Sequence, residues 1–195
     1  MIVKPSAESL AAAATAASGA GAGTRSLPPV ERWNPPFCGA IDMRIARDGT
    51  WFYLGTPIGR PALVRLFSTI LTREGDDYFL VTPVEKVGIR VDDAPFVAVD
   101  FTVAGTGRGQ NLTFTTQTGD QAAAGPDHPM RVAYAPDGEP APYIHIRRNL
   151  EALIDRKSFY RMIELCRHQP HQGQNWFGLW SGGMFFPVML SADLA

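Results

Sequence analysis

The sequence lacks most of the patterns by which a reaction or a cofactor is recognised. It contains only two cysteines, Cys38 and Cys166, without C-x-x-C spacing, so neither a disulfide framework nor a zinc knuckle is predicted. Cys166, His168 and His171 lie close together, but their spacing fits no standard zinc site, and we predict no metal and no cofactor. The G-x-S-x-G motif of a hydrolase nucleophile is absent, and no run of about 18 apolar residues predicts a membrane span.

The chain also lacks an excess of charge of either sign. Its 18 basic and 19 acidic residues give a formal net charge of -1 at pH 7. Because there is no basic stripe and no helix-turn-helix pattern, specific nucleic-acid binding is not expected. Hydrophobic residues make up 45% and charged residues 19%, which is a globular composition. No leucine-rich stretch typical of a signal peptide opens the chain, and with so few cysteines we expect a cytoplasmic protein.

Residues 1–36 are predicted to form a flexible leader rich in alanine, glycine and proline. Ser6 offers a hydroxyl to the free amides of a short helix over Ala7–Ala17, because alanine has the highest helix propensity. Ser18–Gly23 is predicted to be flexible, and two Pro-Pro pairs then stiffen the approach to the folded body.

Residues 37–94 are predicted to form an N-terminal α+β module. Apolar and polar residues alternate on both sides of Asp48-Gly49, which supplies the positive φ angles of a tight turn, so a β-hairpin is predicted. The hydrophobic period then changes to that of a helix. The predicted elements are the hairpin over Ile41–Leu54, a helix over Arg60–Leu71, a polar loop over Thr72–Asp77, and strands over Tyr78–Thr82 and Val87–Val91.

Residues 95–190 are predicted to form a C-terminal α+β module of mainly antiparallel strands. Asn149 is placed as the N-cap of a helix, because its side chain can accept hydrogen bonds from free helix amides. The predicted elements are strands over Phe96–Val103, Asn111–Thr116, Met130–Tyr134 and Tyr143–Ile146, a helical stretch from Asn149 to Cys166, a polar loop over His168–Asn175, and a last strand or hairpin over Trp176–Val188.

The two modules share an order of elements: an Asp-Gly turn, a strand, an amphipathic helix, a polar loop and an aromatic strand. The first copy begins at Asp48-Gly49 and the second at Asp137-Gly138. Residue identity between the copies is negligible, so a duplicated hairpin-helix-strand motif is a hypothesis. If it holds, the seam between the two modules is the natural place for a cleft.

Several long strings of the sequence resemble a bacterial family called domain of unknown function 1285. The match runs from about residue 27 to residue 188 and leaves the leader outside. The matching strings are Cys38–Tyr53, Gly55–Arg60, Leu80–Lys86, Tyr143–Arg148, Leu150–Tyr160 and Trp176–Gly183.

The resemblance implies a fold more than an activity, because the family has no established reaction. It implies an α+β arrangement with a duplicated core motif and a C-terminal half similar to a pleckstrin-homology domain. It also implies a binding site at the interface between the halves, for a nucleotide-like ligand, and a role in signal transduction.

A cluster of cationic residues stands where a predicted strand ends and the predicted helix begins. Arg147, Arg148 and Asn149 would combine guanidinium groups with the free amides of a helix N-terminus, which favours a phosphate or carboxylate. The alternative is that the arginines form surface ion pairs with acidic neighbours such as Glu151 and Asp155.

Other candidates for ligand contacts lie at strand ends and turns. Glu85 could accept from a ligand amine or hydroxyl and Lys86 could meet an anion; the alternative is an exposed ion pair. Trp51 or Trp180 could stack on a base, although most aromatics must be core. Ser181 and Gly182 form either a ligand loop or a plain turn.

Taken together, these features predict a non-enzymatic sensor or binding protein for an anionic, nucleotide-like small molecule in signal transduction. One alternative is a protein-interaction adaptor. Another is an uncharacterised hydrolase acting through Asp42, Glu85 or Ser181.

Overall fold

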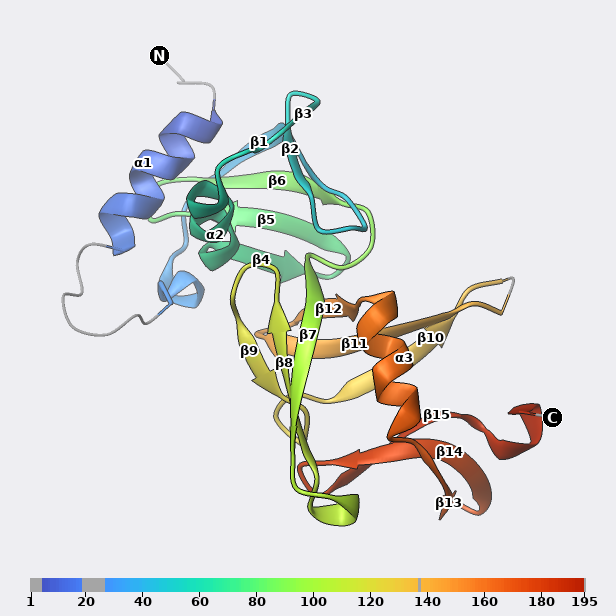
Figure 1. Ribbon diagram of the computed structural model, residues 1–195. Coiled ribbons are helices and arrows are strands. Elements are labelled where there is room, and N and C mark those ends of the chain that lie inside the picture. Colours follow the sequence, from blue (N-terminus) through green and yellow to red (C-terminus); the bar gives the residue numbers. More distant parts are fainter. Residues whose placement is uncertain (1–4, 19–26, 137, 195) are drawn as a thin grey trace. The chain divides into compact units, whose positions relative to one another are not determined.

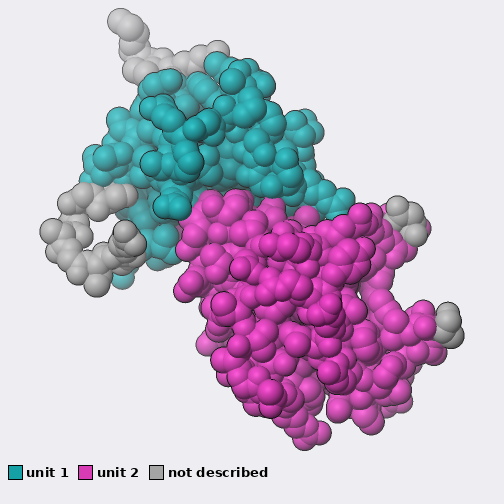
Figure 2. Space-filling view, in the orientation of Figure 1, with its two compact units in different colours: residues 1–95 teal, residues 96–195 magenta. Residues whose placement is uncertain are grey.

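The computed structural model describes residues 5–18, 27–136 and 138–194. The chain forms two compact units, residues 1–95 and 96–195 (Figure 2). Within the described ranges, three α-helices and two six-stranded sheets make a mixed α+β fold, which confirms the predicted class (Figure 1). No helix among the described residues is both long and apolar enough to cross a bilayer. Residues 19–23 of the predicted flexible segment, and Asp137 of the second predicted turn, lie outside the described ranges.

Unit 1 is built on a six-stranded sheet with the order β3-β2-β1-β6-β5-β4. The central strands β1 and β6 are parallel, and each of the other neighbouring pairs is antiparallel. The strands are β1 Phe37–Ile45, β2 Trp51–Tyr53, β3 Thr56–Pro57, β4 Leu71–Glu74, β5 Asp77–Val81 and β6 Lys86–Val91.

The hairpin predicted around Asp48-Gly49 is confirmed. Ile45 pairs with Trp51 across the antiparallel β1 and β2, and Gly49 has a φ of 85°. An Asp48 carboxylate oxygen accepts a hydrogen bond from the Thr50 amide at 2.9 Å. This bond stabilises the charged carboxylate and thereby lowers the pKa of Asp48.

Helix α2, Pro61–Thr69, covers one face of this sheet. The ring of Phe67 stacks on that of Trp51 with centroids 6.3 Å apart, and both side chains are buried. Leu80 and Val87 face the same core and are fully buried. The predicted helix is confirmed, but the polar loop predicted over Thr72–Asp77 is wrong. Strand β4 covers Thr72–Glu74, because an edge strand tolerates polar residues on its exposed side, and β5 begins at Asp77.

Helix α1, Ala7–Ser18, packs against α2, as Figure 1 shows. The Ser6 hydroxyl accepts a hydrogen bond from the Ser9 amide at 3.2 Å, which confirms the predicted cap. Leu10 and Ala14 are fully buried. A short 3-10 helix, Val30–Arg32, separates α1 from β1.

Unit 2 contains a six-stranded sheet, a three-stranded sheet and helix α3, Arg156–Glu164. The six-stranded sheet has the order β10-β11-β12-β7-β8-β9, and its central strands β7 and β12 are parallel. Its strands are β7 Phe96–Ala104, β8 Asn111–Thr116, β9 Gln121–Ala123, β10 Met130–Tyr134, β11 Pro140–Arg147 and β12 Leu150–Ile154. The smaller sheet contains β13 Arg167–His171, β14 Gln174–Ser181 and β15 Met184–Leu190. Short 3-10 helices cover Gly107–Gly109 and Ser191–Leu194.

The prediction that a helix starts at Asn149 is wrong. Leu150–Ile154 is strand β12, in which Leu150, Ala152 and Ile154 are buried in alternation. Helix α3 begins only after Asp155, whose carboxylate accepts from the Ser158 amide at 2.8 Å. The alternation of buried residues has the period of a strand, and it directly precedes a true helical pattern. The loop predicted over His168–Asn175 is likewise wrong: β13 extends to His171 and β14 begins at Gln174, with a short turn between them.

The two six-stranded sheets have the same topology. Numbered within its own unit, each sheet runs 3-2-1-6-5-4, so that its first and last strands form the central parallel pair. Helix α2 lies between the third and fourth strands of unit 1, whereas α3 follows the sixth strand of unit 2. The repeat therefore lies in the strand topology and not in the predicted hairpin-helix-strand alignment. The likeness of the C-terminal half to a pleckstrin-homology domain stays a prediction.

Candidate functional site

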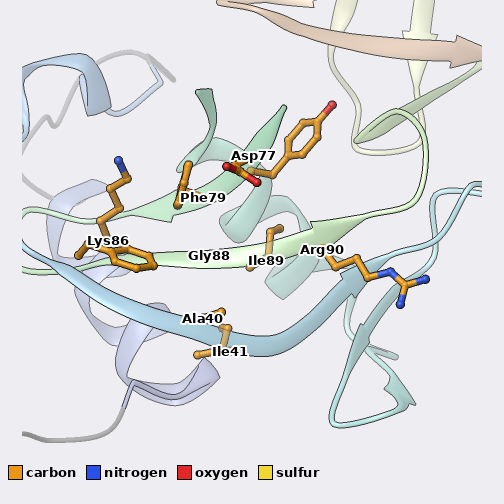
Figure 3. Close-up of a pocket in the computed structure, with 10 residues that line it drawn as sticks. Ala40, Ile41, Asp77, Phe79, Lys86, Gly88, Ile89 and Arg90 are labelled. Carbon is orange, nitrogen blue, oxygen red and sulfur yellow. The ribbon is translucent and has the colours of Figure 1, made fainter. Parts of the chain in front are cut away.

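An open groove of about 540 Å³ lies in unit 1, lined by residues of β1, β5 and β6 (Figure 3). Three residues aligned across neighbouring strands form its floor. Phe79 of β5 pairs with Gly88 of β6, and Gly88 pairs with Ala40 of β1. Neighbouring Leu80 and Val87 point to the opposite, buried face of the sheet. We call the Phe79, Gly88 and Ala40 side the outer face.

Two irregularities in β1 shape this groove. From Phe37 to Arg44 the register of β1 against β6 shifts twice, so β1 carries extra residues at the centre of the sheet. Gly39 lies in the first shift with a φ of 90°, a conformation that favours glycine. Bulges of this kind bend a strand and redirect its side chains, which here opens the outer face.

Phenylalanine rings line one end of the groove. The Phe37 and Phe79 rings are T-shaped, with centroids 6.0 Å apart and an interplanar angle of 88°. Phe37 is 61% exposed, which is unusual for so large an apolar residue in a strand. The floor beside these rings is low because Ala40 and Gly88 have almost no side chain.

Cationic side chains stand at both ends of the groove. Lys86 Nζ lies 4.3 Å from the centre of the Phe79 ring and 2.5 Å from a Glu74 carboxylate oxygen. At the other end, Arg90 and Arg44 both pair with Asp92. The hydrogen bond from Arg44, and the charges of both arginines, lower the pKa of Asp92. Two guanidinium groups share the Asp92 carboxylate there, and the Asp77 carboxylate also lines the groove.

Lys86 is the predicted ligand residue that lines this groove; its neighbour Glu85 does not. A Glu85 carboxylate oxygen instead accepts a long hydrogen bond of 3.4 Å from the Ser9 hydroxyl of α1. Trp51 is 1% exposed and stacks on Phe67, so it offers no free face to a base. The stacking role predicted for Trp51 is therefore unsupported by its position.

The predicted anion cluster at residues 147–149 lies on a β-hairpin turn and not at a helix N-terminus. Arg148 has a φ of 53°, and Arg147 ends strand β11. The Arg147 guanidinium pairs with Asp120 and lies 4.7 Å from the centre of the Phe96 ring. Burial lowers the pKa of Arg147, while Asp120 opposes that shift. A ligand role for Arg147, Arg148 and Asn149 stays a prediction, but it has lost the helix on which it was based.

Trp180 and Ser181 end strand β14, and Gly182 begins the turn to β15. The Ser181 hydroxyl is fully buried, accepts from the Leu112 amide at 2.9 Å and donates to the Ala124 carbonyl at 2.7 Å. The Gly182 amide donates to Asn111 Oδ1 at 3.0 Å. These bonds join the turn to neighbouring segments of unit 2, which describes a structural role for Ser181.

Trp180 is partly exposed, and the Arg108 guanidinium lies 5.0 Å from the centre of its ring. Its predicted stacking role stays a prediction. Within the described ranges, no group of three or more His, Cys, Asp and Glu side chains is arranged to hold a metal ion.

Four residues of the groove were not predicted from the sequence: Phe37, Phe79, Gly88 and Arg90. A signal was present in Lys86–Val91, where Lys86, Gly88 and Arg90 alternate with apolar residues. This alternation predicts a strand with an apolar face and an opposite face that carries two cationic side chains and a glycine.

The chain is thus a two-unit α+β protein: its two six-stranded sheets have the same strand order, and the sheet of unit 1 carries a groove on its outer face. Two family models match the chain: the N-terminal domain of DUF1285, a domain of unknown function, over residues 28–94, and the C-terminal domain of the same family over residues 95–188. The chain belongs to the DUF1285 family.

Two solved structures of this family are similar to the chain. A protein from Silicibacter pomeroyi DSS-3 is 63% identical, with a TM-score of 0.83, over 95% of this chain and 97% of its own. A protein from Shewanella baltica OS155 is 31% identical, with a TM-score of 0.49, over 63% of this chain and 90% of its own. A search of the curated proteins gives no match.

Removing the partner of the buried Arg147 should destabilise unit 2. Asp120→Ala leaves a guanidinium that is 10% exposed without its main carboxylate, so we expect a loss of about 3 kcal/mol in the free energy of unfolding. Chemical denaturation measures it. Glu139→Ala is the matched control, since its pair with Arg156 is exposed and should contribute less than about 1 kcal/mol. Equal stability of both variants would contradict a structural role for Arg147.

The two cysteines should differ sharply in reactivity. Cys38 is exposed, whereas burial raises the pKa of the Cys166 thiol to about 12. Because the thiolate is the reactive form, a disulfide reagent at pH 8 should modify one thiol per chain quickly and the second only on unfolding. Mass spectrometry of the labelled protein identifies the site. Rapid labelling of Cys166 in the native protein would be incompatible with its burial.

Proposed function

We propose that this protein is a non-enzymatic binding protein whose unit 1 groove holds a small, planar, anionic ligand of nucleotide-like chemistry. The observation that carries the proposal is Gly88. A Cβ added there would meet the Ala40 Cβ at 3.5 Å and Phe37 Cε2 at 3.9 Å, which are ordinary contacts. Neither packing nor backbone geometry requires a glycine at this central position. Its effect is to keep the floor of the groove open.

The dimensions and chemistry of the groove support such a ligand. Its volume of about 540 Å³ lies within the range of small-molecule sites, roughly 300–1,000 Å³. A flat ring system can lie over Ala40 and Gly88 against the Phe37 and Phe79 rings, since aromatic rings favour such contacts. A phosphate or carboxylate at the far end would meet Arg90, which is 73% exposed.

A catalytic function has less support. The Ser181 hydroxyl is engaged by two backbone groups, and Glu85 contacts α1 instead of the groove. Asp42, the remaining acid considered from the sequence, is exposed on β1. A role in signal transduction, which the family resemblance implies, remains part of the proposal, as does the cytoplasmic location expected from the few cysteines. A ligand site at the seam between the modules stays a prediction.

An adaptor role is the second candidate, and the exposure of Phe37 favours it. An apolar side chain of a partner protein could occupy the same groove, because exposed large apolar residues are common at interfaces. The two candidates differ in what fills the groove. Stabilisation by a small molecule supports the first, and a stoichiometric protein complex lost on Phe37→Ala supports the second.

Larger side chains at Gly88 should impair ligand binding without lowering the stability of unit 1. We expect Gly88→Ala to leave unit 1 folded and to raise its stability by about 0.5–1 kcal/mol, since glycine weakens a strand interior. Gly88→Val should in addition abolish the thermal shift that nucleoside monophosphates give the wild-type protein. Differential scanning fluorimetry over a concentration series of each compound measures both effects.

Two controls make this test specific. Gly178→Ala should destabilise the protein, because a Cβ there would lie 2.8 Å from Phe185 Cζ and 2.9 Å from Pro187 Cα. Val84→Ala, at an exposed site away from the groove lining, should change neither binding nor stability. The proposal fails if no nucleotide or phosphorylated metabolite shifts the wild type, or if Gly88→Val binds as well as the wild type.

A further inference from the structure

Helix α1 is held on unit 1 by few side chains. Its most buried residues are Ala7, Leu10 and Ala14, and of these only Leu10 is large. Two of the hydrogen bonds between the helix and the rest of the unit are long: the Ala7 amide donates to the Tyr53 hydroxyl, and the Ser9 hydroxyl donates to Glu85, both at 3.4 Å. Bonds of this length are weak, so they orient α1 and add little to its affinity.

Its length also makes α1 dependent on docking. The helix has 12 residues, and isolated helices shorter than about 12–15 residues are marginal in water. Undocking would therefore unfold it. The covalent connection through residues 19–29 keeps α1 near its site, so that docking requires little intrinsic affinity. The family model for the N-terminal domain begins only at residue 28, after this helix.

One short segment contacts α1 on one side and carries an end of the groove on the other. Glu85 and Lys86 are neighbours, and their side chains point to opposite faces: Glu85 contacts Ser9, whereas Lys86 lines the groove. The Glu85 amide donates to the Thr82 hydroxyl at 3.2 Å. The Lys86 amide donates to the Pro36 carbonyl at 3.1 Å, directly before Phe37 of the groove.

We propose that α1 docks reversibly and that its departure loosens the Lys86 end of the groove, so that the helix regulates the site. The regulatory meaning rests on the proposed function of the groove. The docking and its coupling to residues 85 and 86 do not, and they can be measured without a ligand.

Hydrogen exchange of the full chain, followed residue by residue without added ligand, tests this. In the wild type we expect the amides of α1 to exchange at least about 30-fold faster than those of Leu80 and Val87, because docked segments with few buried contacts open locally. Leu10→Ala should accelerate exchange in α1 by about a further 30-fold, as expected for loss of a buried leucine. The Glu85 and Lys86 amides should accelerate with it, while Leu80 stays unchanged.

Thr15→Ala is the matched control on the exposed side of the same helix and should leave Glu85 and Lys86 unaffected. If wild-type α1 exchanges as slowly as Val87, the helix is part of the core and the proposal is overturned. If Leu10→Ala accelerates α1 alone, the coupling is overturned. Neither outcome depends on nucleotide binding, whose failure would instead count against the proposed function.

Discussion

Each six-stranded sheet depends on a single parallel pair of strands. In unit 1, the pair of β1 and β6 joins two antiparallel sets of three strands, β1 to β3 and β4 to β6. In unit 2, the pair of β7 and β12 joins the sets β7 to β9 and β10 to β12. Antiparallel neighbours are connected by short turns, but the parallel pair is closed only when the whole set has formed. The groove lies on this pair in unit 1, because the register shifts of β1 against β6 set its floor.

A cation between an aromatic ring and a carboxylate recurs in both units. Lys86 lies over Phe79 beside Glu74, and Arg131 lies over Tyr143 beside Glu151. Two further arginines are placed in the same way. Arg147 lies over Phe96 beside Asp120, and Arg161 lies over Phe101 beside Asp100. The hydrogen bond from Arg161 lowers the pKa of Asp100. Such cations belong to the packing of the sheets, which explains why arginine clusters in the sequence are poor indicators of an anion site here.

Short-range patterns predicted much of the fold, and long-range register determined the rest. Asp48-Gly49 and the helical period after Pro61 act over a few residues, so the hairpin and α2 were predictable. The run Leu150–Ile154 was not, because a strand and a helix adjoin there and β7, one of the strand's two partners, lies far earlier in the chain. Of the groove, the alternation within Lys86–Val91 indicates one strand face, but the alignment of Phe79, Gly88 and Ala40 follows from pairings that no local pattern encodes.

The position of Gly88 also bears on why a groove exists at all. Glycine costs a strand interior roughly 0.5–1 kcal/mol relative to alanine, and β-branched residues fit a central strand better still. At Gly178 a side chain would collide with Phe185, so packing accounts for that glycine; at Gly88 the nearest atom to an added Cβ is 3.5 Å away. A sheet selected for stability alone would carry a side chain there. A glycine that lowers stability beneath an open, aromatic groove fits the proposal that the groove binds a ligand, because a binding surface can oppose optimal packing.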